Sequence, residues 1–310
     1  MGKVDTILQG DVIKRLKDIE DNTIQCVVTS PPYWGLRDYG EDNQLGLEET
    51  PEEYVENMVK VFREVRRALK DDGTLWLNLG DTYSAQRWTK KGMDRTEGQP
   101  MNKMRDDWRA IAPTKKSGLP DKNLVGIPWR VALALQQDGW YLRQDIIWHK
   151  PNPMPESVTD RCTKSHEYIF LLTKSANYYY DAESIKEPAQ NWGTRDRSNF
   201  RNGTKDKLLI HHGLKDANFA ELGRNKRSVW KINTKPYKEA HFATFPEELP
   251  TLCIKAGSRK NDIVLDPFFG SGTTGFVAQR LYRKWIGIEL NPDYIKIANK
   301  RFVQQELFNV

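Results

Sequence analysis

Blocks of apolar residues recur along the chain, and their length and spacing predict strands separated by helices. Residues 24–28 form a nearly continuous apolar run, which is typical of a strand buried on both faces of a parallel sheet. Ser30, Pro31 and Pro32 follow that run and must end the strand, because proline cannot donate to a sheet ladder. We predict further strands at 6–11, 74–79, 142–148, 168–172, 263–266 and 285–289.

Helical spacing fills the intervals between these strands. The clearest helix begins at Thr50, an N-cap residue followed by Pro51 and two acids, and its apolar positions recur at helical spacing as far as Leu69. Further helices are predicted at 12–20, 128–137, 246–256, 273–282 and after Asn291. Strands that alternate with helices predict an α/β fold, an open sheet with helices on both faces.

Two segments lack this periodicity and are rich in basic residues. Residues 84–122 carry a net charge of +5 and residues 186–238 carry +8, whereas the whole chain carries +6, so the remainder is acidic. We interpret 84–122 as a surface insertion and 186–238 as a separate region that divides one folded domain into 1–185 and 239–310. Two basic segments on an acidic body favour a surface that binds a polyanion, although solvated loops with incidental charge explain the pattern equally well.

Composition narrows the class of protein. With 38% hydrophobic and 29% charged residues, the chain of 310 residues is typical of a soluble globular protein. No apolar run approaches the roughly 18 residues of a membrane span, so no membrane partner is expected. Cys26, Cys162 and Cys253 are scattered and odd in number, which favours a reducing cytoplasm over a disulfide frame or a zinc site. We therefore expect no metal centre.

A strand, an acid, a glycine turn and a helix follow one another over 263–282, which is the arrangement of a nucleotide-cofactor site. Gly270 and Gly272 can adopt conformations closed to other residues and admit a cofactor close to the backbone. Glu289 ends the next strand, 23 positions after Asp266, where an acid commonly binds ribose hydroxyls. An acid at the end of the first strand would repel a pyrophosphate but attract an amino group, which favours S-adenosylmethionine as the cofactor.

Asp11 also ends a predicted strand. If that strand lies beside the other two, Asp11 becomes a third acid at the same edge of the sheet and could accept a hydrogen bond from an adenine amino group. An N-cap for the helix that begins near Val12 explains this aspartate equally well, and one side chain could serve both roles.

The sequence Ser30-Pro31-Pro32-Tyr33 suits a planar exocyclic amine, whose lone pair is delocalised into its ring. Ser30 Oγ and the Pro31 carbonyl, aimed at the two amine hydrogens, would draw the nitrogen toward tetrahedral geometry, while the Tyr33 ring could stack on the base. Positioning then supports an in-line attack on the cofactor methyl group without a covalent nucleophile. Cys26 lies inside a predicted strand, which disfavours thiolate attack on a ring carbon.

These two motifs, in this order, resemble those of the DNA methyltransferases that modify cytosine N4 or adenine N6, and in particular their β group. The resemblance covers nearly the whole chain: the Ser-Pro-Pro-Tyr motif first, then a target-recognition region at 186–238, then 266–274. It implies a Rossmann-like, S-adenosylmethionine-dependent methyltransferase sheet of seven mostly parallel strands, one of them antiparallel, with circularly permuted motif order. The predicted strands 142–148 and 168–172 match the final hairpin of that family.

The resemblance also implies roles for individual residues. Phe245 and Pro246 match the segment that covers the cofactor methionine, and Asp11 matches the acid near its adenine. The other cofactor-binding residues belong to the glycine turn and the next strand end: Asp266, Pro267, Phe268, Gly270, Ser271, Gly272, Thr273, Thr274 and Glu289. Basic residues of the target-recognition region would contact phosphates or guanine edges of DNA: Arg195, Arg197, Arg201, Arg224, Lys226 and Arg227. Glu167 could lie near the active site, but a structural ion pair is favoured.

Serine at the first motif position is more usual for cytosine N4 and aspartate for adenine N6, so the resemblance favours cytosine N4 in double-stranded DNA, with adenine N6 as the alternative. Enzymes that methylate RNA or a protein amide more often carry Asn-Pro-Pro-Tyr, after the cofactor motif. A non-catalytic nucleic-acid-binding module would have lost motif residues, and both motifs are intact. A homodimer and a cognate restriction endonuclease stay open as partners.

Overall fold

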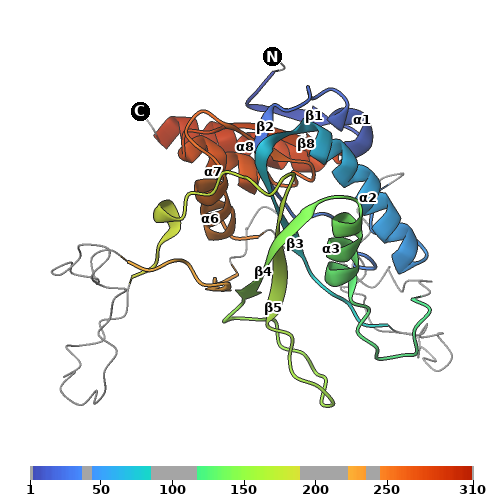
Figure 1. The fold of residues 1–310 in the computed structure, drawn as a ribbon. Coiled ribbons are helices and arrows are strands. Elements are labelled where there is room, and N and C mark those ends of the chain that lie inside the picture. The colour runs from blue at the N-terminus through green and yellow to red at the C-terminus, as the bar shows by residue number, and fades with distance from the viewer. Residues whose placement is uncertain (1–2, 37–43, 85–116, 189–222, 235–244, 309–310) are drawn as a thin grey trace, which may run out of the picture. The chain divides into compact units, whose positions relative to one another are not determined.

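The computed structural model describes residues 3–36, 44–84, 117–188, 223–234 and 245–308 (Figure 1). The chain divides into two compact units, Met1–Tyr180 with Ser228–Val310, and Asp181–Arg227. The described part of the first unit holds one sheet of eight strands. They are β1 (Thr6–Gln9), β2 (Ile24–Thr29), β3 (Leu69–Leu79), β4 (Tyr141–His149), β5 (His166–Thr173), β6 (Val229–Lys231), β7 (Ile263–Asp266) and β8 (Lys284–Glu289).

The strand order in this sheet is β1-β8-β7-β2-β3-β5-β4-β6. Every neighbouring pair is parallel except the two that involve β5, which runs antiparallel to both β3 and β4. The predicted mostly parallel α/β sheet with one antiparallel strand is therefore confirmed. The described sheet exceeds the expected seven strands by β6, an edge strand of three residues. Strands from the end of the chain, β7 and β8, lie between β1 and β2 from its beginning.

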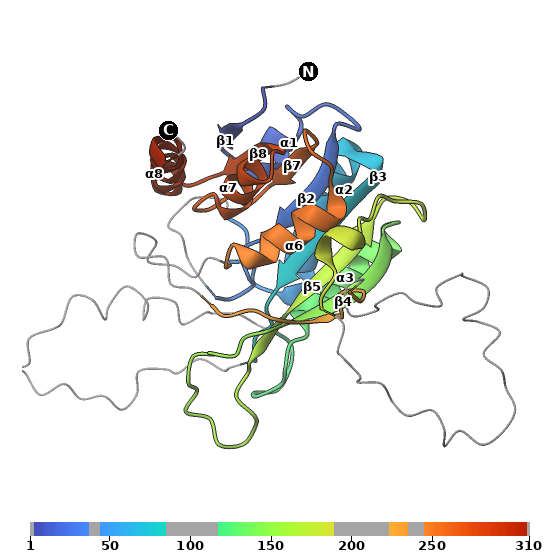
Figure 2. The ribbon, with the colours of Figure 1, turned by 90° about the vertical axis from the view of Figure 1, so that its left-hand side faces the viewer.

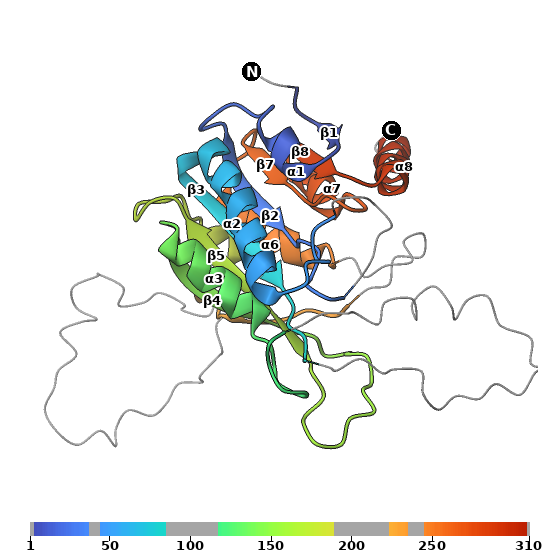
Figure 3. The same ribbon diagram turned by 90° about the vertical axis from the view of Figure 1, so that its right-hand side faces the viewer.

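Helices cover both faces of the sheet. Figure 3 shows α1 (Val12–Leu16), α2 (Pro51–Ala68) and α3 (Ile127–Gln137) in front of one face. The opposite view in Figure 2 shows α6 (Glu248–Gly257) and α7 (Thr273–Arg280) on the other face, with α8 (Pro292–Phe308) beside α7. Both faces are buried, which explains why the central strands β2 and β7 read as continuous apolar runs.

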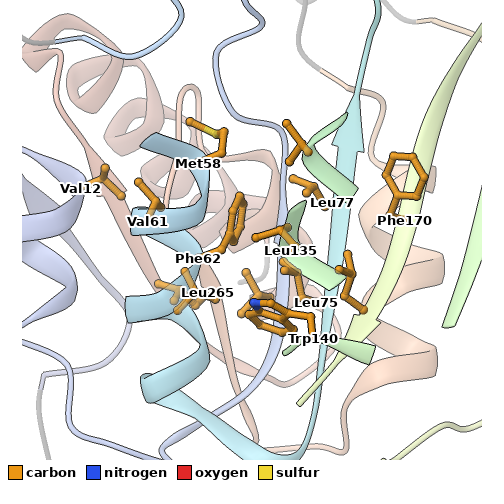
Figure 4. Packing of buried hydrophobic residues seen from close by; sticks show 14 of the residues in the cluster. Val12, Met58, Val61, Phe62, Leu75, Leu77, Leu135, Trp140, Phe170 and Leu265 are labelled. Carbon is orange, nitrogen blue, oxygen red and sulfur yellow. The ribbon is translucent and has the colours of Figure 1, made fainter. Parts of the chain in front are cut away.

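Helix α2 forms the main contact on its face of the sheet. Its N-terminus is a capping box, in which Thr50 Oγ1 accepts from Glu53 N at 3.2 Å and the Glu53 carboxylate accepts from Thr50 N at 3.4 Å, so the predicted helix start is confirmed. Figure 4 shows Met58 and Phe62 of this helix packed toward Leu77 of β3. All three side chains are fully buried.

Several elements begin or end at other residues than predicted, among them β1, which ends at Gln9 rather than at Asp11. Three further differences have a clear structural cause. Helix α1 ends at Leu16, because the amides of Asp18 and Ile19 bond three residues back, to Arg15 and Leu16 carbonyls, as turns. Strand β3 begins at once where α2 ends, since Leu69 already has extended backbone angles. Strand β6 lies inside the predicted segment 186–238 yet pairs with β4, so this part of the segment belongs to the first unit.

No helix within the described ranges is both long and apolar enough to cross a membrane.

Replacing Phe62 with alanine should lower the free energy of unfolding by about 3–5 kcal/mol, because it leaves a cavity between α2 and the sheet. Urea unfolding followed by circular dichroism measures this change. Glu56→Ala, on the exposed side of the same helix, is the matched control and should shift stability by less than about 0.5 kcal/mol. Equal effects of the two substitutions would contradict the assigned packing of α2.

Candidate active site

The candidate site lies along the edge where the parallel strands reach their carboxyl ends. Asp11 follows β1, Glu289 ends β8, Asp266 ends β7 and Ser30 follows β2, and these four strands are consecutive in the sheet. Adjacent parallel strands end at the same edge, where open α/β sheets bind their ligands. The sheet thus brings together the two motifs that lie near opposite ends of the sequence.

The Asp266 carboxylate is the buried centre of this edge, with only 1% of the residue exposed. Thr29 Oγ1 donates to its Oδ1 and Thr274 Oγ1 donates to its Oδ2, both at 2.7 Å. Phe268 N also donates to Oδ1, at 3.1 Å. The carboxylate therefore joins the residue before Ser30 to both sides of the glycine turn.

Burial raises the pKa of Asp266 to about 7, and the nearby Glu289 charge adds to the rise. The hydrogen bonds from Thr29, Thr274 and Phe268 N act in the opposite direction and favour the charged form. A carboxyl group with this pKa changes its charge near neutral pH, at the point where the two motifs meet.

The glycine turn itself is shaped by close packing. Gly270 has φ +50° and Gly272 has φ +79°, and a Cβ on Gly272 would lie 3.1 Å from Ala298 Cβ. A larger residue at Gly272 would be strained by both its backbone angle and its neighbours. The Ser271 hydroxyl is buried and has no hydrogen-bond partner among the described residues. A glycine turn that presents an unpaired polar atom fits a ligand lying close to the backbone.

The two flanking acids are oriented by backbone amides. Glu289 accepts from Gly270 N at 2.7 Å and from Asn291 N at 2.8 Å, which ties the end of β8 to the glycine turn. Asp11 Oδ1 accepts from Lys14 N at 3.0 Å and caps α1, so the N-cap explanation of this aspartate is confirmed. The position of Asp11 beside β8 is compatible with a second role toward a ligand.

Phe245 and Pro246, the predicted cover of the cofactor, come just before α6. The next residue, Glu247, accepts from Arg301 Nη2 at 2.7 Å. Arg301 Nη1 also donates to Thr273 Oγ1 at 3.0 Å. The Arg301 side chain, 8% exposed, thereby ties this segment to the first residue of α7.

The Ser-Pro-Pro-Tyr loop is held from several elements. Tyr54 of α2 donates its hydroxyl to the Pro32 carbonyl at 2.9 Å, whereas no described residue donates to the Pro31 carbonyl. The Tyr33 ring lies against Gly80, at the end of β3, where a Cβ would come within 2.6 Å of the ring. Any side chain at Gly80 would therefore displace Tyr33.

The Tyr33 hydroxyl is surrounded by polar groups. It donates to Glu167 Oε2 at 2.7 Å, lies 3.3 Å from Asn78 Oδ1, and accepts from Ser30 Oγ at 3.2 Å. Burial, followed by the negative charge of Glu167, raises the pKa of Tyr33 well above its usual value, so the hydroxyl keeps its proton.

Two residues of this network, Asn78 and Glu167, belong to no sequence motif that would indicate their role. The sequence places Asn78 only in a strand. It predicts a structural ion pair for Glu167, which the contact with Lys150 Nζ confirms. Both nonetheless belong to the network at the Tyr33 hydroxyl, because β5 lies directly beside β3. In the sequence, the only indication of this role is that each residue is polar and lies near the end of an otherwise apolar strand.

The predicted DNA-contacting residues fall in two groups. Arg195, Arg197 and Arg201 lie outside the described residues. Arg224, Lys226 and Arg227 are described and belong to the unit Asp181–Arg227, which also contains the short 3-10 helix η2 (Glu183–Ile185). In that unit Glu187 accepts from Arg227 Nε at 2.8 Å and lies 3.5 Å from Arg224 Nε. Arg227 remains 65% exposed at its side chain.

Comparison with known proteins gives one consistent picture. A family model described as DNA methylase matches residues 24–300. The chain is 48% identical over 301 residues to the type II methyltransferase M.SmaI of Serratia marcescens, covering 96% of this chain and 91% of that protein. It is 47% identical over 305 residues to the type II methyltransferase M.Cfr9I of Citrobacter freundii, covering 98% and 89% of the two chains.

Solved structures share the same fold. PvuII DNA methyltransferase, named as cytosine-N4-specific, matches with a TM-score of 0.63 at 21% identity, covering 96% of this chain and 86% of that one. TTHA0409, a putative DNA modification methylase from Thermus thermophilus solved with S-adenosyl-L-methionine, matches with a TM-score of 0.59 at 25% identity, covering 96% and 93%.

Asp266→Asn should change how stability depends on pH. The folded carboxyl has a pKa of about 7 against 3.8 for an unperturbed aspartate, so between these values the folded state binds more protons than the unfolded state. The wild-type free energy of unfolding should therefore fall as pH rises from about 4 to about 7, by on the order of 3 kcal/mol from this group. The variant should lack this component.

Urea unfolding of both proteins at a series of pH values measures the difference. Asp293→Asn, whose side chain is 77% exposed at the start of α8, is the control and should keep the wild-type pH dependence. Parallel curves for wild type and Asp266→Asn would refute the raised pKa.

Proposed function

The chain belongs to the DNA methylase family, and from that membership we propose that it transfers a methyl group from S-adenosylmethionine to N4 of cytosine in double-stranded DNA. The observation that carries this proposal is the junction between the two motifs, where Asp266 binds both Thr29, the residue before Ser30, and Thr274 of the glycine turn. One buried carboxylate thereby joins the loop that would bind the target amine to the glycine turn that would bind the cofactor.

S-adenosylmethionine is the cofactor, and the residues at the strand ends fit it. We propose that Gly270, Ser271 and Gly272 receive it against the backbone, that Glu289 binds its ribose, and that Asp11 contacts its adenine. Asp266, with Pro267, Phe268, Thr273 and Thr274, would shape the pocket for its amino-acid end, covered by Phe245 and Pro246. When bound, the cofactor supplies an electrophilic methyl group on a positively charged sulfur, which negatively charged side chains favour.

The catalytic loop acts on the target amine by positioning it. Ser30 Oγ and the Pro31 carbonyl accept from the two amine hydrogens, which weakens conjugation of the nitrogen lone pair with the ring. Pro31 and Pro32 restrict the loop backbone, and Tyr54 anchors it at the Pro32 carbonyl. The Tyr33 ring gives a surface on which the extruded base can stack. This position would align the amine lone pair with the methyl group that S-adenosylmethionine supplies, so that the carbon–nitrogen bond would form as the carbon–sulfur bond breaks and one amine proton would be released to solvent.

The two buried cysteines do not support covalent catalysis, in which a thiolate attacks a ring carbon of the base. Burial raises the pKa of the Cys26 thiol to about 12, so it carries no thiolate at neutral pH. The Cys253 thiol is buried as well, and its pKa is also raised by burial. Neither group suits a nucleophile.

Cytosine N4 is favoured over adenine N6 by Ser30, which stands where adenine enzymes more often carry aspartate. The solved structure named as cytosine-N4-specific adds weight to this choice, although its likeness extends only to the fold. We further propose 1–185 and 239–310 as the two halves of the methyltransferase domain and 186–238 as the target-recognition region, except for β6, which pairs with β4 in the sheet of the first unit. Arg224, Lys226 and Arg227, together with Arg195, Arg197 and Arg201, would contact DNA there.

The type II names of the relatives favour a cognate restriction endonuclease as a functional partner. A homodimer is the simplest further assembly, and the molar mass of the protein in solution would distinguish it from a monomer.

Nucleoside mass spectrometry of DNA from cells that express the protein should detect N4-methylcytosine. The physical reason is the acceptor pair at Ser30 and Pro31, which suits an exocyclic amine and offers no route to a ring carbon. DNA from cells that express Tyr33→Ala, which loses the stacking ring, should carry little or none of it. N6-methyladenine as the sole product would exclude cytosine while leaving the cofactor and the mechanism in place.

Glu289→Ala should weaken S-adenosylmethionine binding by at least about tenfold, because the site loses an acceptor that also orients the Gly270 amide. Isothermal titration calorimetry measures the affinity. Glu248→Ala, on the exposed first turn of α6, serves as control and should bind as the wild type does. Unchanged affinity of Glu289→Ala would remove this residue from the cofactor site.

A further inference from the structure

We propose that Glu167 is a positioning residue that fixes the direction of the hydrogen bonds at Ser30, so that the Ser30 oxygen can only accept from the target amine. The proposal rests on the proposed amine methylation and names the group that prepares its acceptor. It applies equally to a cytosine or an adenine amine, since both donate two hydrogens.

The direction is set where the Tyr33 hydroxyl meets two acceptors. An ionised carboxylate has no hydrogen to give, so the contact between Tyr33 and Glu167 Oε2 at 2.7 Å uses the tyrosine proton. Asn78 Oδ1 lies farther away, at 3.3 Å. A hydroxyl has one proton, and the shorter, charge-assisted bond to Glu167 takes it.

The surroundings prevent this direction from reversing. Asn78 Nδ2 donates to Glu167 Oε2 at 3.1 Å and to the Tyr168 carbonyl at 3.1 Å, and both partners are acceptors, so the amide cannot turn over without losing both bonds. Lys150 Nζ donates to the other oxygen, Oε1. The Glu167 side chain is 16% exposed and that of Lys150 19%, so water competes little for these contacts.

The direction of the Tyr33 hydrogen bond determines the direction of the hydrogen bond between Tyr33 and Ser30. With its proton committed to Glu167, the Tyr33 oxygen accepts from Ser30 Oγ at 3.2 Å. The Ser30 proton is then directed toward Tyr33, and the serine lone pairs are left for the amine. If Glu167 were a donor, the chain could reverse, and the Ser30 hydrogen would face the amine hydrogens.

The packing of the Tyr33 ring points to a role for its hydroxyl beyond holding the ring in place. Its ring already packs against Gly80, so the hydroxyl is not needed to hold the ring against β3. What the hydroxyl adds is a link between a carboxylate on β5 and a serine after β2. Removing the link at either end should therefore have the same effect on methyl transfer.

The test compares Glu167→Gln, Tyr33→Phe and the double variant by single-turnover methylation of duplex DNA with radiolabelled S-adenosylmethionine. The glutamine can donate to Tyr33, and the phenylalanine keeps the ring but interrupts the chain. Each single variant should lower the transfer rate by at least about tenfold, with the dissociation constants of cofactor and DNA within about twofold of wild type. The double variant should be no slower than the slower single variant, because Glu167 acts through Tyr33.

Glu64→Gln is the matched control, since Glu64 is a half-buried carboxylate in an ion pair with Arg67 on α2, away from the loop. It should transfer at the wild-type rate. A wild-type rate for Glu167→Gln, or effects that multiply in the double variant, would overturn the proposal. If Glu167→Gln does not fold, as judged by cofactor binding, Tyr33→Phe decides, and its wild-type rate would also overturn it.

Failure of the proposed function is distinguishable, because the wild-type protein would then transfer no label to any base of the DNA.

Discussion

The buried carboxylate of Asp266 is the interaction on which the site depends. Its hydrogen bond to Thr29 joins the ends of β2 and β7, which come from opposite ends of the chain, and its bond to Thr274 adds the start of α7. A buried carboxylate is costly unless it is fully bonded, so its partners must stay in place whenever it is charged. The same bonds that stabilise Asp266 therefore fix the separation between the glycine turn and the Ser-Pro-Pro-Tyr loop, and the proposed methyl transfer requires that separation to be constant.

The Ser-Pro-Pro-Tyr loop is likewise held along its whole length. Thr29 anchors its start, Tyr54 anchors Pro32, and Glu167 with Asn78 anchors the Tyr33 hydroxyl. The anchors come from β7, α2, β3 and β5, elements that are themselves packed in the core. A loop fixed from so many rigid elements loses its conformational entropy during folding rather than during each reaction cycle.

Features that depend on neighbouring residues along the chain can be predicted from the sequence. The β2 strand, the Thr50 cap and the glycine turn each have a local signature, and all three are present. The sequence alone does not assign Asn78 and Glu167 to the Tyr33 hydroxyl, because that contact depends on which strands pair and in which register. The length of α1 likewise depends on the turns that follow Leu16. The small edge strand β6 depends on its pairing with β4, which no local pattern indicates. The sequence predicts that Asp266 attracts a ligand, but its bonds to two threonines depend on how the elements pack.

Pairing between β2 and β7 joins Cys26 to Val264 and Val27 to Leu265, so it closes a loop that contains most of the chain. Folding slows as the sequence separation of native contacts increases. On the ribosome, β2 would emerge long before β7 and would wait with one edge unpaired. The strand that precedes the Ser-Pro-Pro-Tyr loop is therefore among the last to be paired on both sides, and until then its apolar edge is open to aggregation.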